Sequence, residues 1–507
     1  MSNSRTRNSA KNVALGFAAQ IIVLIINFIT RTIFIHYLGA EMLGISGLYT
    51  NILSLLSMAE LGFGNAIIYS MYRPIKNKDE KQIAALLNYY RRIYISIIGA
   101  IVVAGCILIP FLTYIVHSSL DNRDLIAYYI LFLINTVCSY AFVYKTSIIN
   151  AQQKMYITKI INVSVLVVQL LAQTTILAIS QSYVAFLIVQ ICCTLLNNIL
   201  CSAIANRMYP YIRQSASLQP SHKKEIKKNV SSIFLYKVSG TILNNTDNIF
   251  ISMLVNTIAV GFYSNYYMVV SALSNIIFIF FNAITASVGN LMTEKDSEKQ
   301  ESVFMQLNYI CFFITGFCVI ELIAIFNSFI TIWVGSDYLM DNNITIIIII
   351  NFYIYTMQNP IWTFRDTTGL FKDAKNDTIL LAIVNIVLSF IMGKICGVFG
   401  ILLATVVSRL LITSWHQPYL LYKKIFKHGY SKFISKQLLY VGIVLISSIP
   451  SVLINQFIIE TTLLHTIIKA IIVAISTLLI FTITTYRTKE FTQCKNRIMQ
   501  LIKSRNN

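Results

Sequence analysis

The sequence of 507 residues predicts an all-α polytopic membrane protein with about 14 transmembrane helices, built as two parallel six-helix lobes followed by two further helices. Three observations carry this prediction. Apolar runs of about 20 residues recur along the whole chain, and each is long enough to cross the hydrocarbon core as a helix. Basic residues gather in alternate loops, and a stretch near the N-terminus recurs near the middle of the chain.

The composition places the chain in a membrane. Hydrophobic residues make up 56% of it and charged residues 12%, with a mean hydropathy of +0.68, far from the balance of a soluble domain. The first apolar run is too long for a signal peptide and has no cleavage site after it, so we expect it to remain and span. The fourteen expected spans are 12–38, 45–72, 93–116, 125–149, 157–180, 183–206, 230–256, 262–290, 302–327, 344–364, 376–393, 400–421, 437–458 and 466–486.

The net charge of +20 suggests either a nucleic-acid partner or a membrane topology, and the placement of the charges decides between them. Of the 40 Lys and Arg residues, 33 lie in eight alternate segments, while the other seven loops hold only Arg123 and Lys394. This split predicts an even number of spans with both termini in the cytoplasm. We therefore expect membrane lipids, and no nucleic acid, beside the chain.

An internal repeat predicts the organisation of the spans. The stretch TRTIFIHYL (30–38) recurs as TDNIFISML (246–254), and with one residue inserted the match continues so that Gly44 pairs with Gly261. Six spans separate the copies, so both cross the membrane in the same direction, as in parallel repeats that place a substrate site between them. The expected parts are a lobe at 1–206, a cytoplasmic linker at 207–229, a second lobe at 230–421, and two helices with a basic tail at 422–507.

Charged residues inside the spans are the first candidates for a functional site, because a charge near the bilayer centre costs roughly 3 kcal/mol or more. Arg31 and Asp247 are repeat-equivalent and lie at similar depth, about 10 and 13 Å below the outer ends of their helices. We expect them to attract one another across a cleft when its outer mouth closes; pairing of each within its own lobe is an equal alternative. Stripes of polar residues on the same two helices add further candidates for the cleft, although such stripes can also serve only to hold helices together. The candidate cleft residues are Arg31, Lys237, Asp247, Asn27, Asn244, Asn248 and Arg409.

Glu60 breaks the repeat symmetry, because its partner position holds the apolar Ile277. A carboxylate at this depth would either carry a proton or pair with Arg31 or Arg409. Glu60 and Glu321 are the candidates for ion coupling, by proton or sodium. Aromatic residues cluster near span ends, as in NYYRRIY (88–94), where interfacial belts explain most of them.

No motif for catalysis is present. The nine cysteines and six histidines show no metal-ligand spacing, and no phosphate-binding GxxxxGK[ST] loop occurs. The loops on the outer side are too short for a catalytic domain. We therefore expect a secondary transporter without a catalytic residue, a metal or a cofactor.

Three stretches then resemble a known family: RTIFIHYLGAEMLGISGLYTNILSLLSMAELGFGNAIIYSMY, ILNNTDNIFIS and RDTTGLFKDAK. They are similar to Wzx-type polysaccharide-repeat flippases of the multidrug/oligosaccharidyl-lipid/polysaccharide exporter superfamily. The resemblance implies transfer of an undecaprenyl-diphosphate-linked oligosaccharide across a bacterial plasma membrane by alternating access, for capsule or O-antigen biosynthesis, beside a polymerase and glycosyltransferases. It also implies a basic cavity, to which Arg31 and Lys237 correspond and from which Glu60 departs. A cation-coupled multidrug or small-molecule exporter is the alternative, and an integral-membrane polymerase a weaker one.

Overall fold

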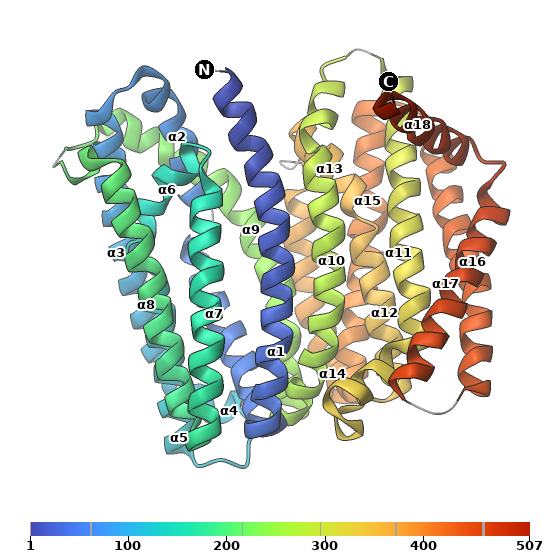
Figure 1. Ribbon diagram of the computed structural model, residues 1–507, viewed down its shortest axis with the longest axis horizontal. Coiled ribbons are helices and arrows are strands. Elements are labelled where there is room, and N and C mark those ends of the chain that lie inside the picture. Colours follow the sequence, from blue (N-terminus) through green and yellow to red (C-terminus); the bar gives the residue numbers. More distant parts are fainter. Residues whose placement is uncertain are drawn as a thin grey trace. The chain divides into compact units, whose positions relative to one another are not determined.

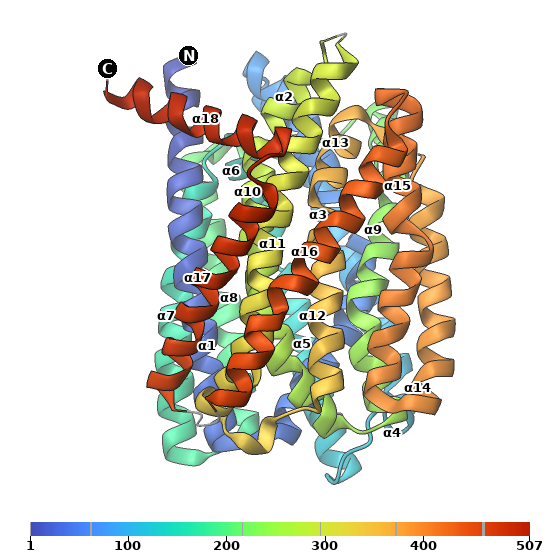
Figure 2. The ribbon, with the colours of Figure 1, turned by 90° about the vertical axis from the view of Figure 1, so that its right-hand side faces the viewer.

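The computed structural model describes a chain of helices and turns (Figures 1 and 2). The described residues are 2–60, 63–214, 216–294, 296–370, 373–458 and 462–506. Within them, ten helices are long and apolar enough to cross a membrane, or up to eleven if one bent pair forms a single span. The chain is a multi-pass, all-helical membrane protein, as its apolar runs predict.

Contacts divide the chain into two compact units, Met1–Gly261 and Phe262–Asn507. In the first unit, α7 packs against α8 and α1, and α9 packs against α1. Its elements are α1 (Ser2–Leu56), η1 (Ser57–Glu60), α2 (Phe63–Asn77), α3 (Glu80–Leu108), η2 (Ile109–Phe111), α4 (Leu112–Ile115), α5 (Asn122–Tyr140), α6 (Val143–Ala151), α7 (Met155–Ser180), α8 (Tyr183–Met208), η3 (Pro210–Arg213) and α9 (Pro220–Leu254).

In the second unit, α11 is the central helix, and α12, α16 and α17 pack around it. The last helix, α18, lies across the end of this unit rather than along it (Figure 2). The elements are α10 (Thr257–Leu291), whose first residues belong to the first unit, α11 (Ser297–Val334), η4 (Ser336–Tyr338), α12 (Asn342–Thr356), α13 (Asn359–Thr368), α14 (Lys375–Leu411), α15 (Thr413–Leu421), the π-helix η6 (Tyr422–Phe426), α16 (Tyr430–Phe457), α17 (Leu463–Thr485) and α18 (Lys489–Asn506).

The difference between ten helices and fourteen predicted spans has a local cause. Two long helices each contain a glycine with positive φ, Gly39 at 76° in α1 and Gly397 at 57° in α14. Only glycine adopts such angles without strain, and each one falls between two predicted spans. The predicted span 125–149 is the bent pair of α5 and α6, which meet at 41°. The remaining prediction, 230–256, lies in α9, which begins as a polar helix.

The predicted boundaries at 206 and 230 concern the repeat and stay a prediction. In this structure the helix that would open the second lobe, α9, groups with the first unit. The helix α9, which the sequence assigns to the second lobe, packs against α1 of the expected first lobe. This pair of helices carries several of the candidate site residues.

Candidate functional site

The α1–α9 pair brings two of the predicted charges onto neighbouring helices. Arg31 is half-buried on α1, and Asp247 is buried on α9 with 9% of its surface exposed. Because α1 and α9 pack together, both charges belong to one helix pair within the first unit. Direct pairing of the two side chains stays a prediction, while their placement on adjacent helices is what a shared polar path requires.

The other predicted residues of this pair have different surroundings. Asn27 is exposed on α1, four residues before Arg31. Asn248 is half-buried, and its Oδ1 atom is enclosed without a hydrogen-bond partner among the described residues. The side chains of Lys237 and Asn244 lie outside the described residues, although both positions are helical in α9.

A reciprocal contact of two glycines joins the part of α1 that follows the Gly39 kink to the start of α10. A Cβ added to Gly44 would overlap the carbonyl oxygen of Thr257, and a Cβ added to Gly261 would overlap that of Ala40. Each carbonyl belongs to the residue four positions before the opposite glycine, so the two copies meet in the same way. We call Ala40, Gly44, Thr257 and Gly261 the glycine crossing; small residues spaced by four allow such close backbone approach in membrane helices.

The segment 115–119 fastens the same end. Ser252 Oγ donates to the Ile115 carbonyl at 2.8 Å, and His117 Nδ1 donates to the Ser252 carbonyl at 2.9 Å. Thr257 N donates to the His117 carbonyl at 3.1 Å.

On the α1 side, the Glu41 carboxylate accepts from both serines that follow His117. Ser118 Oγ lies at 2.6 Å and Ser119 N at 2.7 Å from Glu41 Oε1. The segment 115–119 therefore ties α9 to the kink of α1. Sequence reasoning missed this contact; a charged residue two positions after Gly39 was its only signal.

Glu60 lies at a break in the membrane helix, in the 3-10 turn η1 between α1 and α2. Its carboxylate accepts a hydrogen bond from Tyr94 Oη, which in turn lies 2.9 Å from Tyr90 Oη. Tyr90 and Tyr94 are each 2% exposed, so these two tyrosines are buried and do not form part of an interfacial belt.

No ion pair joins Glu60 to a cation among the described residues, and its pairing with Arg31 or Arg409 stays a prediction. Hydroxyl groups provide its neighbours instead. We call Glu60, Tyr90 and Tyr94 the Glu60 cluster. Such a cluster can hold either a carboxylate or a neutral carboxyl group, because a hydroxyl both donates and accepts.

The two remaining candidates lie in the second unit. Arg409 on α14 donates from Nη1 to Asn351 Oδ1 on α12 at 2.7 Å, and its guanidinium lies 4.9 Å from the ring centre of Tyr355. These contacts bind two helices together. Glu321 on α11 is half-buried, and its Oε1 atom is enclosed with no hydrogen-bond partner among the residues described.

A separate cluster of polar and charged side chains, which sequence reasoning missed, lies where α13, α14 and α15 meet. Arg365 is 3% exposed and donates from Nη1 to Gln417 Oε1 at 3.1 Å, while His416 Nδ1 lies 2.7 Å from Asp377 Oδ2. These contacts fasten the ends of three helices. No group of three or more His, Cys, Asp or Glu residues suited to a metal ion occurs in the described part of the chain.

Comparisons with known proteins agree with this architecture. Residues 9–285 match a family model described as "Polysaccharide biosynthesis protein". This match covers more than half of the chain and includes α1 through most of α10, hence both copies of the repeat and the glycine crossing. A search of the curated proteins finds no significant match.

Solved structures share the fold at low identity. The structure titled "Lipid II flippase MurJ, inward closed conformation" has a TM-score of 0.68 at 15% identity, covering 94% of this chain and 99% of that one. An inward-facing multidrug resistance transporter of the MATE family, in the MOP superfamily, has a TM-score of 0.62 at 14% identity, covering 79% and 95%. A MOP superfamily transporter from Pyrococcus furiosus has a TM-score of 0.56 at 12% identity, covering 80% and 93%.

Proposed function

The chain belongs to the polysaccharide biosynthesis protein family, and from this premise we propose that it is a flippase for an undecaprenyl-diphosphate-linked oligosaccharide. It moves the lipid from the inner to the outer leaflet of the bacterial plasma membrane by alternating access, for capsule or O-antigen biosynthesis. The structurally similar lipid II flippase supports a lipid-linked sugar as the substrate class.

The observation that carries this proposal is the packing of α1 against α9, the two repeat-related helices, each of which holds a charge at membrane depth. A diphosphate sugar head group needs a hydrated, partly cationic path, while its polyprenyl tail remains in lipid. Arg31 and, from the sequence, Lys237 supply the cations of that path. Asn27, Asn248 and Asn244 supply neutral polar groups for sugar hydroxyls.

The contacts that the region after the Gly39 kink of α1 makes with α10 and with the segment 115–119 suggest how access alternates. The glycine crossing and the segment 115–119 hold the outer end closed, and opening would break both contacts. Asp247 then attracts Arg31 in the closed state and releases it when the lobes rock apart. With the termini in the cytoplasm, this gate faces the outer leaflet, where the product leaves.

Transport rather than catalysis is the proposed activity, and the protein works beside a polymerase and glycosyltransferases that use and supply the lipid. The test is the pool of lipid-linked repeat units and the surface glycan in three strains: wild type, a deletion, and Arg31→Ala. We expect inner-leaflet repeat units to accumulate and surface glycan to disappear in the deletion, with a partial defect in Arg31→Ala. An unchanged pool in the deletion strain would contradict the proposal.

A second candidate function is a cation-coupled exporter of small molecules. The Glu60 cluster favours it, because a carboxyl group held by tyrosine hydroxyls at a helix break is suited to proton exchange. It predicts that the deletion strain keeps its glycan and becomes sensitive to small cationic drugs. The wild-type and deletion strains therefore distinguish the two candidate functions.

A further inference from the structure

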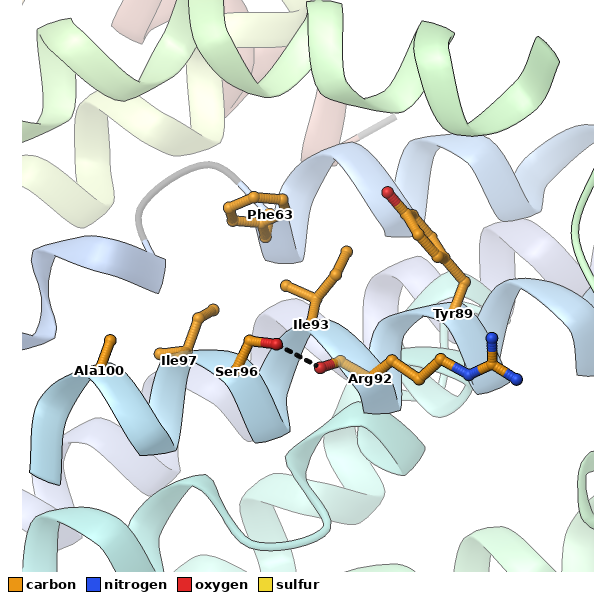
Figure 3. Close-up of a pocket in the computed structure, with 7 residues that line it drawn as sticks. All are labelled: Phe63, Tyr89, Arg92, Ile93, Ser96, Ile97 and Ala100. Carbon is orange, nitrogen blue, oxygen red and sulfur yellow. Dashed lines mark hydrogen bonds between the residues drawn. The ribbon is translucent and has the colours of Figure 1, made fainter. Parts of the chain in front are cut away.

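An open groove of about 430 Å³ lies between α2 and α3 in the first unit. Figure 3 shows Phe63 on the α2 side facing Ile93 and Ile97 on α3, with Tyr89 and Arg92 towards one end. The lining residues are Phe63, Tyr89, Arg92, Ile93, Ser96, Ile97 and Ala100. One end of the groove is therefore cationic and the rest is mainly apolar.

Depth along α3 gives these two ends different environments. The span runs from Glu80 to Ile115, and at about 1.5 Å per residue Arg92 lies roughly 35 Å from its outer end. The hydrocarbon core is about 30 Å thick. With the outer end at the outer interface, Arg92 reaches the inner head groups while Ala100 lies among acyl chains.

The cationic end has positive charge available for a ligand. No ion pair or side-chain hydrogen bond engages the Arg92 guanidinium among the described residues, and Arg92 is exposed. Lys223, at the start of α9, places its Nζ atom 5.9 Å from the ring centre of Tyr89. Arg92, which lines the groove together with Tyr89, and Lys223, which lies over the Tyr89 ring, thus place two cations at this end of the groove at the head-group level, where a phosphate would be their natural counter-ion.

We propose that this groove binds one anionic glycerophospholipid of the inner leaflet. Its phosphate lies between Arg92 and Lys223, and the first half of one acyl chain lies along Ile93, Ile97 and Ala100. A single phosphate matches the two cations, and the apolar wall covers only about 10 Å from Ile93 to Ala100, which suits the start of a chain that continues into the bilayer. The proposal rests on the orientation given under the proposed function, but not on the transported substrate.

The groove adjoins the Glu60 cluster, which gives the bound lipid a consequence. Phe63 follows Glu60 by three residues, and a Cβ on Gly64 would lie 3.2 Å from Tyr90 Oη. A lipid between α2 and α3 therefore stabilises the start of α2 against α3. It holds the helix break at Glu60 in the geometry that the tyrosines need.

The test is lipid retention by the full-length purified protein, measured by native mass spectrometry with phosphatidylglycerol, phosphatidylcholine and undecaprenyl phosphate as competing probes. Arg92→Gln removes the charge, and Ala100→Phe fills the apolar end without changing charge. Arg91→Gln is the matched control, because Arg91 is the adjacent exposed arginine and does not line the groove.

We expect the wild type and Arg91→Gln to retain one phosphatidylglycerol in preference to phosphatidylcholine, and Arg92→Gln and Ala100→Phe to retain at least about fivefold less, with recovery in Arg92→Lys. Equal retention in Arg92→Gln and wild type would overturn the proposal. Displacement of phosphatidylglycerol by equimolar undecaprenyl phosphate would also overturn it, because the occupant would then be a substrate-type lipid. Since no transport is measured, failure of the flippase proposal would leave these outcomes unchanged.

Discussion

The glycine crossing yields the sharpest prediction, made with the substitution Gly44→Ala. The added methyl group would overlap the carbonyl oxygen of Thr257, and a backbone atom cannot move aside as a flexible side chain can. The two helices must therefore separate locally for the alanine to fit. We expect this to weaken the contact between α1 and α10 at the glycine crossing while leaving each helix intact.

The size of the effect follows from the cost of overpacking, which is typically about 1–3 kcal/mol per inserted group. If the crossing forms only when the outer end is closed, the whole cost falls on the closed state. At about 1.4 kcal/mol per factor of ten, the ratio of open to closed outer ends rises about 5-fold to 150-fold. A shift of that size is measurable as a change in access from outside.

The assay is labelling of Asn27→Cys in intact cells with a membrane-impermeant maleimide. Asn27 is exposed on α1 and lies far below the crossing, so the reagent reaches it from outside only through an open outer end. The chain has nine free cysteines that can also react with the reagent. The labelling of each variant is therefore measured relative to the same protein without Asn27→Cys. We expect Gly44→Ala to label faster than the unsubstituted protein.

Gly47→Ala is the matched control on the same helix, because its added Cβ would meet Val260 Cγ1 only at 3.7 Å, an ordinary contact. It should label like the unsubstituted protein. Equal labelling of Gly44→Ala and Gly47→Ala would refute the idea that the crossing closes the outer end.

Three further predictions concern the charged residues. Glu60→Gln should abolish the response of transport to an imposed proton or sodium gradient, and Tyr94→Phe should weaken it; a full response in Glu60→Gln would exclude coupling at this site. Arg31→Asp combined with Asp247→Arg should recover part of the glycan lost in each single variant, whereas no recovery would contradict direct attraction between them. Arg409→Gln loses its contacts with α12 and should lower the stability of the protein by about 1–3 kcal/mol, seen as a lower melting temperature with transport retained; lost transport at an unchanged melting temperature would instead place Arg409 on the substrate path.

The sequence predicts the helices well because hydrocarbon leaves few choices: a long apolar run must satisfy its own backbone as a helix. The two glycines that kink α1 and α14 can also be recognised in the sequence, because Gly39 and Gly397 each lie between two predicted spans. The repeat predicts that Gly44 and Gly261 are equivalent, and the structure adds that they meet. Equivalence comes from aligned residues, whereas contact depends on how whole helices pack.

The partners of the charged residues were harder to predict. Glu60 has tyrosine neighbours on α3 because η1 turns it towards that helix, and a local turn of this kind has no periodic signal. The contact of Glu41 with Ser118 and Ser119 joins residues 77 and 78 positions apart. Single-sequence patterns report neighbours along one helix face, so contacts between distant polar residues stay out of their reach.

The repeat also shows where the two halves differ, and a directional transporter needs such a difference. At Glu60 the membrane helix is interrupted by a 3-10 turn, whereas α10 continues without interruption through the equivalent Ile277, which is only 2% exposed. The first half therefore has a titratable group at a backbone break where the second half has a packed apolar side chain. A break is easier to rearrange than a continuous helix, because fewer backbone hydrogen bonds must be exchanged. If a proton or sodium ion drives the opening of one end, its binding energy can move a helix at the Glu60 cluster. The substitution Ile277→Glu would not create a second site of this kind, because α10 has no break at that position.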